Sequence, residues 1–123
     1  MSRVYLETSF VSACVTLRTD AGSVYRRQAS IEWWESERGR HRLFISAEVV
    51  AELSDPKYPR REEALAFIAG VELLPVTEEV LGLAQILVRE KVMPGPLKGD
   101  AVHVAVAAVH GMDYVLSWNV RHL

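Results

Sequence analysis

The chain of 123 residues has almost no cysteine and no long hydrophobic run. Its single cysteine, Cys14, excludes an internal disulfide and a zinc site built from cysteines. No apolar run approaches the ~20 residues that a membrane-spanning helix needs. The first residues, MSRVYLETS, also lack the hydrophobic stretch of a signal peptide. The sequence therefore predicts a protein of the reducing cytoplasm that does not associate with membranes.

An excess of charge of one sign is also missing, since 14 basic and 16 acidic side chains leave a formal net charge of −2. Such a chain has no overall attraction to nucleic acids, so any affinity for them must come from a local patch. Half of the residues are hydrophobic, which is typical of a globular protein and not of a disordered one. We predict one domain over residues 1–123 with a single hydrophobic core.

Short apolar stretches alternate with helical patterns along the chain. We predict strands at residues 3–7, 42–46, 71–76 and 113–117, and helices at residues 10–17, 20–38, 47–54, 60–69, 78–91 and 99–110. Ser46 and Thr77 stand where helix N-caps are expected, as do Thr8 and Ser9. Strands that alternate with helices form a parallel sheet covered on both faces. The predicted fold class is therefore α/β, with three layers and a central parallel sheet of about four strands.

Carboxylate side chains follow the predicted strands or begin helices beside them. Glu7 ends the first strand, and Glu48 and Glu52 lie four residues apart on one face of the helix after the second strand. Asp100 begins the last helix, and Asn119 lies two residues beyond the last strand. Ligands of open parallel sheets bind at the carboxyl ends of the strands. We expect these side chains to gather at that edge.

Acids that gather in this way repel one another. Two negative charges ~4 Å apart repel by ~4 kcal/mol at an effective dielectric constant of about 20. A cluster of Glu7, Glu52 and Asp100 therefore needs cations, protons or helix N-termini to be stable. Hard divalent cations that bind through oxygen, Mg²⁺ or Mn²⁺, suit it best. The simpler alternative is that each acid only caps a helix or pairs with a nearby base, as Asp100 would with Lys98.

The sequence also contains, in this order, the stretches VYLETS, ISAEVVAEL, GDAVHVAVAA and DYVLSWNVRHL. Together they resemble the PIN domain, in particular the VapC-like toxins of bacterial and archaeal type II toxin–antitoxin pairs. The resemblance places the family's four site residues on Glu7, Glu52, Asp100 and Asn119. It implies a metal-dependent endoribonuclease, with RNA as substrate and a small antitoxin protein as partner, and it leaves a homodimer open.

The resemblance also implies a role for each acid. Glu7 and Asp100 would hold a Mg²⁺ or Mn²⁺ ion that activates water for attack on phosphorus, and Glu52 would orient that water or bind a second ion. The sequence departs from the family pattern at three points. Glu7 replaces the usual aspartate, Asn119 is neutral, and the chain ends at Leu123, so that a closing C-terminal segment is short or absent. Glu7 and Asn119 favour an alternative function, a catalytically weak or inactive PIN-fold module that binds RNA or a partner protein.

Three further features each allow two interpretations. His103 is either a core histidine bonded to a neighbour or a partner that orients Asp100. Thr8 and Ser117 are either helix or strand-end caps, the simpler interpretation, or hydrogen-bond donors to the acids. The basic stretch RGRHR (38–42) directly precedes the second strand, so it lies at the opposite, amino edge of the sheet. We interpret it as a solvated loop.

Overall fold

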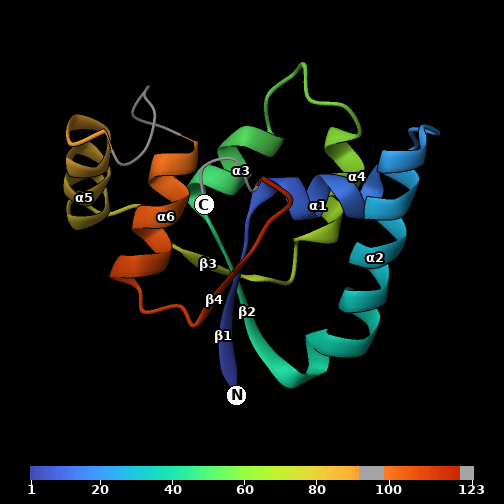
Figure 1. The fold of residues 1–123 in the computed structure, drawn as a ribbon, viewed down its shortest axis with the longest axis horizontal. Helices are drawn as coiled ribbons and strands as arrows, with labels where there is room; N and C mark the ends of the chain where they lie inside the picture. The colour runs from blue at the N-terminus through green and yellow to red at the C-terminus, as the bar shows by residue number, and fades with distance from the viewer. Residues whose placement is uncertain (92–98, 120–123) are drawn as a thin grey trace.

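The structure is a computed structural model, which describes residues 1–91 and 99–119 (Figure 1). Its elements in chain order are β1 (Ser2–Leu6), α1 (Thr8–Val15), α2 (Ala21–Glu37), the 3₁₀ turn η1 (Arg38–Arg40), β2 (His41–Ser46), α3 (Ala47–Leu53), α4 (Arg61–Phe67), β3 (Glu72–Leu74), α5 (Glu78–Arg89), α6 (Asp100–Val109) and β4 (Tyr114–Leu116). Within the described part, no helix has both the length and the apolar character needed to cross a membrane.

The four strands form one parallel sheet in the order β3-β2-β1-β4. The central strand β1 aligns Tyr5 with Phe44 of β2 and Leu6 with Leu116 of β4, so these three strands end at a common edge. Figure 1 shows α5 and α6 on one side of the sheet and α1, α2 and α4 on the other. The predicted α/β fold with three layers is confirmed.

The helix α6 lies between α5 and the core residues of the strands, which explains why its sequence is apolar on most sides. Ala101, Val102, Ala105 and Val106 of this helix are at most 2% exposed. Their small side chains allow the helix to pack closely, and each buried valine stabilises the fold by about 1.5 kcal/mol or more. The polar residue at its start, Asp100, is thereby brought to the carboxyl edge of the sheet.

Two of the predicted N-caps are present in the structure. The Ser46 hydroxyl accepts hydrogen bonds from the backbone N–H groups two and three residues along α3. The Thr77 hydroxyl likewise accepts from the N–H three residues into α5. Because Ser46 ends β2 and caps α3 at once, α3 begins without any connecting loop.

The predicted caps of the first helix are wrong. The helix α1 begins at Thr8, directly after β1, with Glu7 as its N-cap residue and with no side-chain cap. Thr8 and Ser9 therefore lie inside the first turn, where their hydroxyls are available to other partners. The other helices end within about three residues of the predicted positions, and the connector at 92–98 lies outside the described residues.

The basic stretch 38–42 lies at the amino end of β2, as predicted. Residues 38–40 form the exposed turn η1, whereas His41 and Arg42 already belong to β2. Since Ser46 is at the other end of the same strand, this stretch is separated from the carboxyl edge by the length of β2.

Candidate functional site

Two acids and a histidine meet at the carboxyl edge of the sheet. Glu7 follows β1, Glu52 lies on α3 and His103 lies on α6. Each of the three offers one ligand atom, and these atoms all lie within 4.8 Å of one another. Of the four predicted site residues, the structure thus brings Glu7 and Glu52 into direct proximity and adds His103, which was not among them.

Glu7 is an acid buried in the protein, with only 7% of its surface exposed. Its Oε1 atom accepts hydrogen bonds from the hydroxyls of Ser9 and Ser117, the latter at 2.7 Å. Its Oε2 atom lies 3.8 Å from Nε2 of His103. The two serines fix the orientation of the carboxylate and leave Oε2 facing the other site residues.

Glu52 is held by two donors on the same oxygen. Its Oε1 atom accepts from the Thr8 hydroxyl at 2.5 Å and lies 2.6 Å from Nε2 of His103. Burial disfavours the charged carboxylate, but the hydrogen bonds from His103 and Thr8 outweigh this effect and lower the pKa of Glu52 below its usual value. Glu52 is therefore ionised at neutral pH.

His103 is fixed from its other side by a chain of hydroxyls. Its Nδ1 atom lies 2.5 Å from the Tyr5 hydroxyl, which lies 2.7 Å from the Ser46 hydroxyl. Because Ser46 already accepts two backbone hydrogen bonds, its own hydrogen points to Tyr5. Tyr5 then donates to Nδ1, and Nε2 carries the hydrogen that is donated to Glu52.

The neighbouring acids and burial shift the pKa values of His103 and Tyr5. Burial alone would lower the pKa of His103, but the hydrogen bond and the charge of Glu52, together with the charge of Glu7, raise it above its usual value. Burial also strongly raises the pKa of Tyr5, so that its hydroxyl stays protonated. His103 thus keeps a hydrogen on Nε2 in both its neutral and its protonated form.

Asp100 and Asn119 form a second part of the site. Asp100 is the first residue of α6, and its Oδ1 atom accepts a hydrogen bond from Nδ2 of Asn119 at 2.8 Å. The backbone N–H of Asn119 donates to the Ser117 hydroxyl at 2.9 Å, and this hydroxyl donates in turn to Glu7. Hydrogen bonds therefore connect Asn119, Asp100 and Glu7.

Glu48 and Glu52 lie on one face of α3, as predicted, and both contact the start of α6. Oε2 of Glu48 accepts from the backbone N–H of Gly99 at 3.0 Å, and Glu52 contacts His103 four residues further along. Gly99 has φ +66°, a backbone conformation that strains other residues. Glu48 thus holds the chain where α6 begins, and this contact positions Asp100 beside it.

Hydroxyl groups contribute more to the site than the sequence patterns predict. For Thr8 and Ser117 the second of the two interpretations holds, since their hydroxyls donate to Glu52 and Glu7. Tyr5 was missed, although a signal was available: side chains alternate along a strand, so Tyr5 lies on the same face as Glu7.

The free carboxylate oxygens of this arrangement suit a hard divalent cation. Within the described residues, neither Oε2 of Glu7 nor Oε2 of Glu52 accepts a hydrogen bond, whereas both Oε1 atoms have two partners. Oxygen atoms of ionised carboxylates are the preferred ligands of Mg²⁺ and Mn²⁺. The residues therefore fit such an ion.

No family model and no curated protein matches the chain. Among solved structures it is similar to VapC20 from Mycobacterium tuberculosis, described as a sarcin–ricin loop cleaving toxin. The two share 22% identity with a TM-score of 0.73, over 97% of this chain and 92% of that one. VapBC2 from Rickettsia felis, bound to a promoter DNA fragment, shares 16% identity with a TM-score of 0.65, over 93% and 86% of the chains.

FitAcB from Neisseria gonorrhoeae shares 16% identity with a TM-score of 0.58, over 90% of this chain and 84% of that one. All three are PIN-domain proteins of toxin–antitoxin systems. At this level of identity the similarity shows the fold of the backbone alone. It agrees with the resemblance of the four sequence stretches to the PIN domain. The chain therefore has the PIN fold that its sequence predicts.

Proposed function

We propose that this protein is a divalent-metal-dependent endoribonuclease and the toxin of a toxin–antitoxin pair. The observation that carries the proposal is the buried Glu7 beside Glu52, with a carboxylate oxygen of each within 4.8 Å of the other, at the carboxyl edge of a PIN fold. VapC20, which has a similar fold, cleaves the sarcin–ricin loop. A small antitoxin protein is the expected partner, and RNA is the expected substrate.

In this proposal Glu7, Glu52 and Asp100 hold Mg²⁺ or Mn²⁺. A bound divalent ion lowers the pKa of water and stabilises the charge that develops on the phosphodiester. The part played by the protein is to present ionised oxygens in fixed orientations. Ser9 and Ser117 do this for Glu7 through its Oε1 atom, which leaves Oε2 for the ion.

Glu52 has the most elaborate support in the site. Thr8 and His103 both donate to its Oε1 atom, and they keep it ionised. Tyr5 and Ser46 fix the ring of His103 in turn. With its carboxylate held in this way, Glu52 would bind the ion or orient a water molecule beside it.

Asn119 has a different part, because an amide adds no negative charge. Its Nδ2 atom donates to Asp100 and restricts the orientation of that carboxylate. An aspartate at this position would add one negative charge to the site of a second ion, and Asn119 adds none. This favours the second candidate function, a catalytically weak PIN module that binds RNA or a protein partner through the same surface.

A cleavage assay tests the proposal. Purified protein is incubated with total RNA and with an RNA that contains the sarcin–ricin loop, in Mg²⁺, in Mn²⁺ or in EDTA. We expect cleavage that needs the cation and is lost in Glu7→Gln and Asp100→Asn. Glu62→Gln is the control, since it removes the same charge from an exposed position on α4. Binding of RNA without cleavage in either cation would favour the weak module and would contradict the nuclease.

A further inference from the structure

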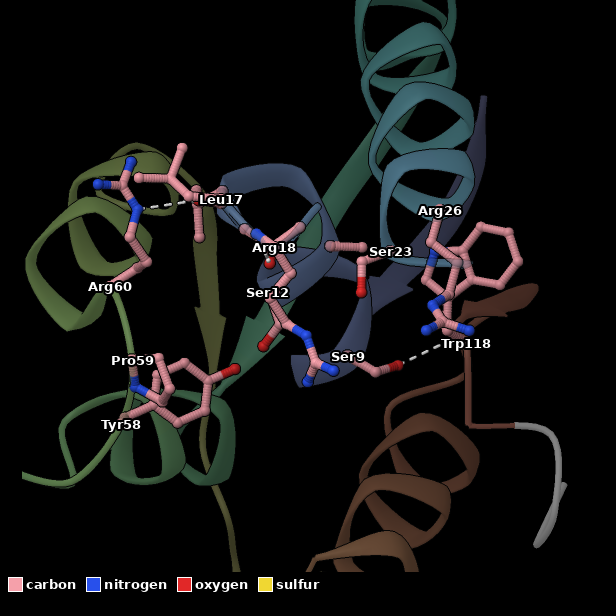
Figure 2. A pocket seen from close by; sticks show the side chains of 13 residues that line it. Ser9, Ser12, Leu17, Arg18, Ser23, Arg26, Tyr58, Pro59, Arg60 and Trp118 are labelled. Carbon is pink, nitrogen blue, oxygen red and sulfur yellow. Dashed lines mark hydrogen bonds between the residues drawn. The ribbon is translucent and has the colours of Figure 1, made fainter. Parts of the chain in front are cut away.

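A pocket of about 550 Å³ lies beside the acids, between α1, the start of α2, the connection from α3 to α4, and the residues after β4 (Figure 2). Its volume is in the range of pockets that bind small organic groups. The side chains that matter for its chemistry are those of Ser9, Arg18, Arg26, Tyr58, Arg60 and Trp118.

The pocket adjoins the acid site along two of its walls. Ser9 lines the pocket, and its hydroxyl donates to Glu7 and accepts from the backbone N–H of Trp118 at 2.8 Å. On the other wall, burial and the charges of Glu52 and Glu7 raise the pKa of Tyr58 to about 12. A molecule that fills the pocket would therefore lie next to the acid site.

Three arginines line the pocket, and two of them have acidic partners. Arg18 pairs with Asp20 at 3.2 Å and Arg60 pairs with Glu63 at 3.3 Å, both near the surface. Arg26 forms no ion pair within the part of the chain that the structure describes. In Figure 2 the guanidinium of Arg18 points into the pocket, toward the side where Ser9 lies. These donors suit a phosphate group.

We propose that this pocket binds one unpaired nucleotide of the RNA, next to the phosphodiester at the acid site. Arg18 and Arg26 bind its phosphate, and the base packs against one of the two aromatic rings, Tyr58 or Trp118, which lie on opposite sides of the pocket in Figure 2. Proteins recognise unpaired RNA in this way, by stacking bases on aromatic side chains and neutralising phosphates with arginine. A base held in a duplex cannot enter, so the pocket selects single-stranded RNA. This inference rests on the proposed ribonuclease function.

Binding is measured in EDTA, so that cleavage does not interfere, from the fluorescence anisotropy of a short labelled single-stranded RNA. The variant is Arg26→Gln. The matched control is Arg27→Gln, because Arg27 is the next residue of α2, is also exposed and is not among the residues that line the pocket. We expect Arg26→Gln to raise the Kd about five- to tenfold and Arg27→Gln to change it less than about twofold.

The salt dependence gives an independent measurement. The logarithm of the association constant falls as the logarithm of the salt concentration rises, and loss of one phosphate contact makes this slope less negative by about 0.7 for a single strand. We expect this change for Arg26→Gln only. Equal affinities and slopes in the two variants would overturn the proposal, and the same equality is expected if the pocket accepts only a protein segment.

The assay also separates this proposal from the nuclease function. A selective loss of affinity in Arg26→Gln, with no cleavage by the wild type in Mg²⁺ or Mn²⁺, would support the pocket and contradict the nuclease. Cleavage by the wild type with unchanged RNA affinity in Arg26→Gln would support the nuclease and contradict the pocket.

Discussion

The hydroxyl of Tyr5 is a buried polar group whose removal has a calculable cost. Tyr5 is 0% exposed, and its hydroxyl lies between the Ser46 hydroxyl at 2.7 Å and Nδ1 of His103 at 2.5 Å. The change Tyr5→Phe keeps the packing of the ring but leaves two buried polar atoms without this partner. Each such atom costs ~1–3 kcal/mol, and the desolvation of the hydroxyl itself is recovered.

We therefore expect Tyr5→Phe to lower the free energy of unfolding by about 2 kcal/mol, a large share of the ~5–15 kcal/mol of a typical domain. Urea denaturation measures this change, with an unchanged dependence on denaturant concentration. Thermal unfolding would show a Tm lower by roughly 8 °C. Tyr114→Phe is the control, since Tyr114 is 62% exposed on β4 and its change should stay within about 0.5 kcal/mol.

A Tyr5→Phe variant within about 0.5 kcal/mol of the wild type would refute this reasoning. It would mean that the hydrogen bonds from Ser46 through Tyr5 to His103 do not fix the imidazole ring of His103 in solution. Glu52 would then lack the support that we attribute to it, although its hydrogen bond from Thr8 would remain.

Two further predictions concern the charges of the site. The pKa of Glu52 is lowered on folding and that of His103 is raised, so their pair stabilises the fold most between about pH 4.5 and 6.5. This stabilisation is lost as the pH falls through the pKa of Glu52 and as it rises through that of His103. The urea midpoint is measured against pH for the wild type and for His103→Gln. The difference between the two midpoints should be largest in that window, and a difference that does not change with pH would show that the pair does not stabilise the fold. Asn119→Asp replaces the donor to Asp100 with a second carboxylate, so it should destabilise the metal-free protein and raise cleavage at low Mn²⁺ concentration. If the dependence of cleavage on Mn²⁺ is unmoved, Asn119 does not limit the site.

The fold was predictable because its signals are local. Alternating strands and helices indicate a parallel sheet, and acids that follow its strands must meet at one edge, as Glu7 and Glu52 do. The connections of the site were less predictable because they depend on register. Ser117 contacts Glu7 only because Leu6 pairs with Leu116, and no local sequence pattern predicts this strand register.

Local propensity was misleading at Thr8. A threonine after a strand is typically a helix cap, but here β1 leads into α1 without a turn, so the hydroxyl donates to Glu52 instead. The partner of His103 could not be predicted for a different reason. Its contact with Glu52 spans 51 residues of sequence and depends on how α3 and α6 pack.

Calorimetric titration with Mn²⁺ in the absence of RNA tests the central claim, that the acids of this edge form a divalent metal site. The account predicts binding by the wild type and by the control Glu62→Gln, and no binding by Glu7→Gln. It also predicts that Mn²⁺ at about 100 times its Kd stabilises the wild type by ~2.7 kcal/mol. Equal Mn²⁺ binding by Glu7→Gln and by the wild type, or no binding by either, would contradict the account.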